Sequence, residues 1–170
     1  MLRTILHTKN LPTVLLVEDS LDDIEFARRA LSKCDAPHRL VIAEDGDAAM
    51  QLLTQPNSEN PHGGPLRPSL VLLDLNITGL DGREVLRRIK SDESLKNTPV
   101  AVLTTSVHPN DVDACYRLGA NCYHQKLNDL GQYEQTIRQV TGYWLTSVVS
   151  PLVADELVLS HTGGYGQSGR

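Results

Sequence analysis

The feature that most constrains the fold of this 170-residue chain is a series of short apolar runs, each closed by a polar residue. Between the runs lie stretches whose apolar residues recur at helical spacing, a pattern typical of βα units and a parallel sheet. The runs predict five strands, at 13–18, 39–43, 70–75, 99–104 and 122–125. The intervening stretches predict five helices, at 20–34, 45–53, 82–90, 109–118 and 129–141.

Five such units predict an α/β fold with a doubly wound, five-stranded parallel sheet in the order 2-1-3-4-5, the flavodoxin-like arrangement. The runs at 70–75 and 99–104 are continuously apolar, as expected of central strands covered on both faces. The run at 39–43 begins with Arg39 and is more typical of an edge strand. Residues 56–68 hold four prolines and two glycines, which predicts an exposed loop.

The length favours one domain with its own core. We expect an N-terminal extension at 1–11, the main domain at 12–142 and a C-terminal extension at 143–170. The last ten residues, from His161 onward, are rich in glycine and serine and are predicted to be disordered.

Composition excludes several classes of protein. The net charge is −5 and no long basic block occurs, so direct nucleic-acid binding is not expected. No apolar stretch approaches the roughly 20 residues that span a bilayer, and the N-terminus lacks the apolar core and cleavage site of a signal peptide. The three cysteines lack metal-type spacing, which predicts reduced thiols in a cytoplasmic protein.

Polar side chains follow four of the predicted strands. Glu18 and Asp19 close the first, Asp74 the third, Thr104 the fourth and Lys126 the fifth. Because sites in open α/β sheets form outside the carboxyl ends of the strands, we expect all five side chains at one edge. Each residue alone could be a helix cap or a solvated group, but five at successive strand ends are poorly explained that way.

The chemistry of this set points to a divalent cation and a transferred phosphoryl group. Neighbouring carboxylates disfavour one another's ionisation unless a counter-charge is present. Their oxygens suit Mg²⁺, which keeps several waters and prefers to be completed by a phosphate. An ionised aspartate can then attack phosphorus and form an acyl phosphate. Lys126 would supply an ammonium and Thr104 a hydroxyl donor.

These residues, with their surroundings, resemble the receiver domain of two-component response regulators. The resemblance runs from about residue 13 to 141 and rests on Glu18-Asp19-Ser20, the segment 74–82 (DLNITGLDG), the segment 99–104 (PVAVLT), Gly119-Ala120 and Lys126. It implies that Asp74 is the phosphoacceptor. It also implies that Mg²⁺ is held by Asp19, Asp74 and the backbone carbonyl of Asn76, with Glu18 acting through water.

The same resemblance implies how a signal is passed on. Lys126 would pair with the phosphoryl oxygens, while Thr104 swings toward the phosphoryl group and Tyr123 rotates inward as a switch pair. We expect a stand-alone regulator, not an enzyme beyond its own phosphorylation and dephosphorylation, whose output is changed protein–protein binding. The expected output face comprises 109–118, 122–125 and 129–141, with the C-terminal extension helping to form a homodimer.

More narrowly, the chain resembles the small receiver-only proteins that partner cyanobacterial phytochrome histidine kinases. The similarity rests on Val17-Glu18-Asp19-Ser20 followed by Asp22-Asp23, on the Pro/Gly-rich insertion, and on the missing proline after Lys126. It implies a sensor histidine kinase of the phytochrome type as partner.

Two positions depart from the common receiver pattern. Receivers usually have proline where Leu127 stands, often through a cis bond, and leucine makes cis costly by ~2.5–4 kcal/mol. The loop after the fifth strand is therefore predicted to be trans. Thr78 also replaces a usual proline, which should leave the carbonyl of Asn76 available.

Three other interpretations remain at this stage. The glycines 164, 166 and 169 match a dinucleotide fingerprint in letters, but no strand precedes them and the printed chain ends one residue later. The segment Asp74-Leu75-Asn76 is similar to the loop of aspartate-nucleophile phosphatases, but Asn76 cannot serve as their general acid. A receiver fold used only as a binding scaffold would leave the set of Asp19, Asp74, Thr104 and Lys126 unexplained.

Overall fold

The computed structural model describes residues 11–61 and 63–149. Most of the predicted N-terminal extension and the predicted disordered end, from His161 onward, lie outside the described residues. The strands are β1 (Thr13–Val17), β2 (Arg39–Ala43), β3 (Leu70–Leu73), β4 (Val100–Thr104) and β5 (Cys122–Gln125). The helices are α1 (Leu21–Ser32), α2 (Gly46–Thr54), α3 (Gly82–Ser91), α4 (Pro109–Arg117), α5 (Leu130–Gly142) and the π-helix η2 (Tyr143–Ser147).

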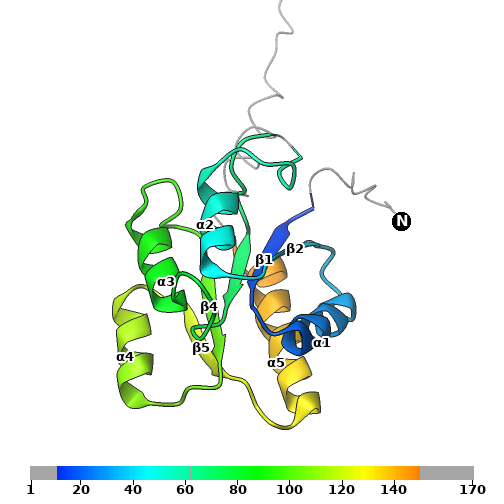
Figure 1. The fold of residues 1–170 in the computed structure, drawn as a ribbon. Helices are drawn as coiled ribbons and strands as arrows, with labels where there is room; N and C mark the ends of the chain where they lie inside the picture. Colours follow the sequence, from blue (N-terminus) through cyan, green and yellow to red (C-terminus); the bar gives the residue numbers. More distant parts are fainter. Residues whose placement is uncertain (1–10, 62, 150–170) are drawn as a thin grey trace, which may run out of the picture.

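The five strands form one parallel sheet in the order β2-β1-β3-β4-β5, which confirms the predicted fold class and strand order. Helices α1 and α5 cover one face, and α2, α3 and α4 cover the other (Figure 1). Every residue of β1, β3 and β4 is buried, because these strands carry apolar side chains toward both helical layers. Because all five strands are parallel, their carboxyl ends lie at one edge of the sheet, and the loops after β3, β4 and β5 lie at that edge (Figure 1).

The connection between α2 and β3 differs in part from the predicted exposed loop. Leu66 within it is 1% exposed and joins the core on the α2–α3 face. Its backbone N–H donates to the carbonyl of Leu52 at 2.7 Å, and the Arg67 guanidinium donates to the carbonyl of Leu53 at 3.0 Å. The loop is therefore anchored at one apolar residue that composition alone did not distinguish.

The C-terminal extension begins as a continuation of α5. Trp144 and Leu145 of η2 pack against the core that α1 and α5 form with the sheet, while Tyr143 and Val149 are exposed. π-helical turns are rare and occur often at functional sites. Within the part of the chain that the structure describes, no helix is both long and apolar enough to cross a membrane.

Candidate functional site

The centre of the candidate site is the ammonium group of Lys126. It donates to Glu18 Oε2 at 2.6 Å, to Asp74 Oδ2 at 2.6 Å and to Asp23 Oδ2 at 2.7 Å. The side chains of Lys126, Glu18 and Asp74 are 6%, 4% and 8% exposed, so most of this charge cluster is removed from water. Three carboxylates therefore share one buried ammonium.

The sheet brings these residues together because its ladders extend one residue past the strands. The N–H of Glu18 donates to the carbonyl of Ala43 at 3.0 Å, and the N–H of Asp74 donates to that of Val17 at 3.0 Å. The N–H of Lys126 donates to the carbonyl of Thr104 at 2.7 Å. The backbone of each of these three residues is thus fixed by a neighbouring strand, at the sheet edge where the strand ends predicted it.

The loop after β3 contacts two carboxylates of the predicted metal site, Asp19 and Asp74. Asp19 Oδ2 accepts from the N–H of Thr78 at 2.9 Å, and Asp74 Oδ1 accepts from the N–H of Asn76 at 3.1 Å. The loop therefore lies against both carboxylates. Thr78, which stands where receivers usually have proline, contributes the backbone N–H that contacts Asp19. No cis peptide occurs in 11–61 or 63–149, so the bond before Leu127 is trans.

The electrostatics of the cluster favour a charged lysine. Burial alone would lower the pKa of Lys126, but the hydrogen bonds that its ammonium donates to Asp23, Asp74 and Glu18 outweigh burial and raise that pKa. Burial raises the pKa of Glu18, against the opposing effect of Lys126, and the nearby charge of Asp74 adds to the rise. The net result is a raised pKa of Glu18, caused mainly by the removal of its carboxylate from water.

The donor set fits a divalent cation. Three carboxylates contact one ammonium, so negative charge exceeds positive charge, and Asp19 follows Glu18 in the chain. Among the described residues, no group of three or more His, Cys, Asp and Glu side chains is arranged as a ready-made cage. Mg²⁺ needs no such cage, because it commonly takes one or two carboxylates and completes its shell with water and phosphate. Asp19 and Asp74, which accept from backbone N–H groups of the loop after β3, are two carboxylates of the kind that Mg²⁺ takes.

The two predicted switch residues both contact the loop after β4. Thr104 is fully buried, and its hydroxyl oxygen is 3.4 Å from the N–H of Ser106, which donates to it. The Tyr123 hydroxyl donates to the carbonyl of Ser106 at 2.9 Å. Burial raises the pKa of Tyr123, so this hydroxyl remains a donor at neutral pH. Both predicted residues therefore contact the same residue of the β4–α4 loop.

Sequence reasoning missed two features of the site. Asp23 contacts Lys126, although in the sequence it contributed only to the narrower resemblance and had no place in the predicted site. Ser106 Oγ donates to Asp111 Oδ2 at 2.6 Å, and Arg83 pairs with Asp111 Oδ1 at 2.9 Å, so α3, α4 and the loop after β4 are joined. An acidic residue in the first turn of a helix that begins at the sheet's carboxyl edge was the available signal for both Asp23 and Asp111.

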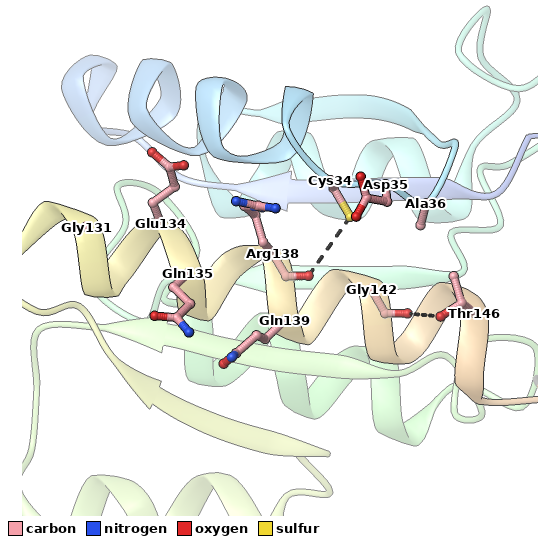
Figure 2. A pocket seen from close by; sticks show the side chains of 10 residues that line it. All are labelled: Cys34, Asp35, Ala36, Gly131, Glu134, Gln135, Arg138, Gln139, Gly142 and Thr146. Carbon is pink, nitrogen blue, oxygen red and sulfur yellow. Dashed lines mark hydrogen bonds between the residues drawn. The ribbon is translucent and has the colours of Figure 1, made fainter.

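A groove of about 620 Å³ lies elsewhere, between the end of α1 and the length of α5. Figure 2 shows Glu134, Arg138 and Gln139 projecting from α5, with Cys34 facing Arg138. None of the predicted site residues lines this groove. The chemistry of the chain is therefore assigned to the sheet edge and not to this cavity.

Comparison with known proteins identifies the family of the chain. The family of response regulator receiver domains matches residues 14–138. The response regulator Rcp1 of Synechocystis sp. is 41% identical over 138 residues, which cover 81% of this chain and 92% of that protein.

Two solved structures are similar over nearly their whole lengths. The crystal structure of the Mn²⁺-bound form of response regulator Rcp1 is 41% identical, with a TM-score of 0.74, and covers 82% of this chain and 99% of that one. The phosphorylated cyanobacterial phytochrome response regulator RcpA is 40% identical, with a TM-score of 0.75, and covers 83% and 99%. The fold, the acid cluster around Lys126 and these matches together place the chain in the family of response regulator receiver domains.

Proposed function

We propose that Asp74 accepts a phosphoryl group from a sensor histidine kinase of the phytochrome type and that the chain signals by changed protein–protein binding. The observation that carries the proposal is the position of Asp74: its carboxylate follows the central strand β3 and lies 2.6 Å from the buried ammonium of Lys126. Because negative charge is in excess around Asp74, the proposed transfer also requires a divalent cation.

In the transfer step, an oxygen of Asp74 attacks the phosphorus of a phosphohistidine. The new O–P bond forms as the N–P bond of the donor breaks, and the departing imidazole nitrogen takes up a proton. Lys126 balances charge on the transferred oxygens. Mg²⁺, when held by Asp19, Asp74 and the Asn76 carbonyl, with Glu18 acting through water, supplies further neutralisation of those oxygens.

Thr104 and Tyr123 form the switch in this proposal. Their shared contact with Ser106 supports it, because a movement of the Thr104 hydroxyl toward the phosphoryl group would disturb the loop to which Tyr123 is bonded. Phosphorylation then shifts the population between two arrangements of this loop. The surface of α4, β5 and α5 changes with it.

The proposal also includes a partner, a domain division, a compartment and an assembly. The similar protein RcpA is a phytochrome response regulator, which supports a phytochrome kinase as the phosphoryl donor for this chain.

We assign residues 12–142 to the receiver unit and residues 1–11 and 143–170 to extensions. We assign the protein to the cytoplasm. A homodimer would use α4, β5, α5 and the C-terminal extension, with no direct contact to nucleic acid and no enzymatic activity toward other substrates.

Acetyl phosphate tests the acceptor directly. With Mg²⁺ it should add one phosphoryl group to the wild type, seen by intact mass, and none to Asp74→Asn. Asp113→Asn is the matched control, because Asp113 is an exposed aspartate of α4 and should still be labelled. An unlabelled wild type would instead favour a receiver fold that serves only as a binding scaffold.

Phosphotransfer tests the partner. A phosphorylated phytochrome kinase should transfer its label to this chain faster than kinases with unrelated sensor domains do. Equal rates from all donors would refute the phytochrome assignment while leaving Asp74 as the acceptor.

A further inference from the structure

We propose that Asp23 is a positioning residue for phosphoryl transfer, which aims the Lys126 ammonium at the phosphoryl group. This inference rests on the proposed function of Asp74. It assigns a role to a carboxylate outside the predicted set of Glu18, Asp19 and Asp74.

The first argument is the geometry of the ammonium. A lysine ammonium has three hydrogens to donate, and here each has one carboxylate acceptor, at 2.6, 2.6 and 2.7 Å. Glu18 and Asp74 belong to the sheet edge, whereas Asp23 approaches from α1 and is 39% exposed. The acceptors therefore hold the ammonium from two separate elements.

The second argument is that Asp23 is not occupied as a helix cap. An acidic residue at this third helical position commonly reaches back to the backbone N–H of the N-cap residue. In α1 that N–H, from Ser20, already donates to Glu18 Oε1 at 3.2 Å. Ser20 Oγ in turn accepts from the N–H of Asp23, which fixes the backbone of Asp23 at the start of the helix. The carboxylate is thus left to contact Lys126.

The third argument concerns what phosphorylation removes. Once Asp74 carries a phosphoryl group, the ammonium must redirect one hydrogen to a phosphoryl oxygen. Glu18 and Asp23 are then the two acceptors that keep its position, and with both in place the third N–H points in one direction. With Glu18 alone, the long lysine side chain regains freedom, and misplacement of a charge-stabilising group slows transfer.

The experiment compares Asp23→Asn with Asp22→Asn. Both substitutions remove one negative charge from the first turn of α1, but Asp22 is exposed and is not among the partners of Lys126. We expect Asp23→Asn to slow labelling by saturating acetyl phosphate about tenfold, with the half-saturating Mg²⁺ concentration unchanged. Asp22→Asn should label at the wild-type rate.

A second comparison asks whether Asp23 acts through Lys126. Asp23→Asn should cause no further slowing in a Lys126→Met background, because the group to be positioned is gone. Further slowing of the same size there would overturn the proposal. Asp23→Glu offers a readout that does not depend on the folding of Lys126→Met: it restores a carboxylate and should recover part of the lost rate, whereas recovery no better than with Asn would count against positioning.

The outcomes separate this inference from the proposed function. If the wild type is not labelled at all, the role of Asp74 is wrong. If the wild type is labelled and Asp23→Asn matches Asp22→Asn, the role of Asp74 stands and that of Asp23 is wrong.

Discussion

At the scale of single residues, the site depends on one buried cation that serves several buried anions. An ion pair at the surface contributes little to stability, because water already solvates both charges. Lys126 differs, since its side chain and those of Glu18 and Asp74 are almost fully removed from water. Removing one partner of a buried pair leaves an uncompensated charge, which costs far more than the pair itself contributes.

We therefore expect Lys126→Met to lower the free energy of unfolding by about 3–5 kcal/mol at neutral pH. Added Mg²⁺ should recover part of that loss, because a bound divalent cation replaces the missing positive charge and stabilises only the folded state. Urea denaturation with and without Mg²⁺ measures both effects.

Lys33→Met is the control for this comparison. Lys33 pairs with Glu134 at 2.9 Å but is 57% exposed, so its loss should cost less than about 1 kcal/mol. Equal losses of unfolding free energy in the two variants would mean that the buried cluster contributes no more to stability than an exposed ion pair does.

The residues of this cluster differ in how far the sequence could predict them. Glu18, Asp74 and Lys126 follow apolar strands, and the topology of a parallel sheet alone brings strand ends to one edge. Asp23 lies on a helix, where its contact depends on the Ser20 N–H being already bonded to Glu18. No spacing rule encodes such competition between two acceptors for one donor, so the contact became visible only in three dimensions.

At the scale of elements, the start of α3 is packed directly against the segment that holds Asp74, the proposed phosphoacceptor. The N–H of Gly82 donates to the carbonyl of Leu75 at 3.1 Å. A Cβ at position 82 would collide with the backbone oxygen of Asp74 and lie 2.7 Å from the Cα of Leu75. Only glycine lets the helix approach the loop this closely.

Gly82→Ala should therefore destabilise the fold by about 1–3 kcal/mol and slow labelling of Asp74 by acetyl phosphate, because the acceptor backbone must move. Gly142→Ala, where an added Cβ meets nothing within 4 Å, should leave labelling unchanged. Thermal unfolding and intact mass after labelling report the two effects. A Gly82→Ala variant with wild-type stability and labelling would contradict this account of the packing.

Strand β5 adds a pH dependence at the edge of the sheet. Burial lowers the pKa of His124 below its ordinary value of 6.5, because the charged imidazolium loses solvation. The unfolded chain then binds more protons than the folded chain just below pH 6.5. Stability from this residue is present above that pH and is lost as the pH falls through the lowered pKa.

Two measurements check this expectation for His124. An NMR titration should place its pKa below 6.5, and His124→Gln should flatten the dependence of unfolding free energy on pH in the same window. A titration midpoint at or above the ordinary value would show that the imidazole is better solvated or better partnered than its burial implies.

At the scale of the whole molecule, the regular βα alternation made the sheet order predictable, because each covered strand and amphipathic helix has only a few compatible places. The irregular parts of the fold were harder to predict from the sequence. Leu66 is buried within a proline-rich connection, and α5 runs on into a π-helix after the helical pattern fades. Neither feature has a repeating spacing, so no sequence pattern indicates it. Each depends on which apolar surface of the folded domain remains to be covered.

The exposed residues of η2 and of the short segment after it bear on the proposed homodimer. Trp144 and Leu145 of η2 are used within the domain, whereas Tyr143 is 57% and Val149 is 70% exposed. Cutting the chain at residue 142 would remove the buried and the exposed residues together and confuse folding with assembly. Substituting only Tyr143 and Val149 leaves the packing of Trp144 in place.

We expect the full-length chain to show concentration-dependent sedimentation, and Tyr143→Ser with Val149→Ser to weaken its dimer about a hundredfold or more, because burying each apolar side chain contributes ~1.5–3 kcal/mol. Leu21→Ser is the control, since Leu21 is 73% exposed but begins α1, outside the proposed face. Its profile should equal that of the wild type. If the double variant also sediments like the wild type at every concentration, before and after phosphorylation, the C-terminal extension takes no part in assembly. Dimerisation through α4, β5 and α5 would then have to be tested by itself, with Tyr116 of α4, which is 50% exposed, as the first position to change.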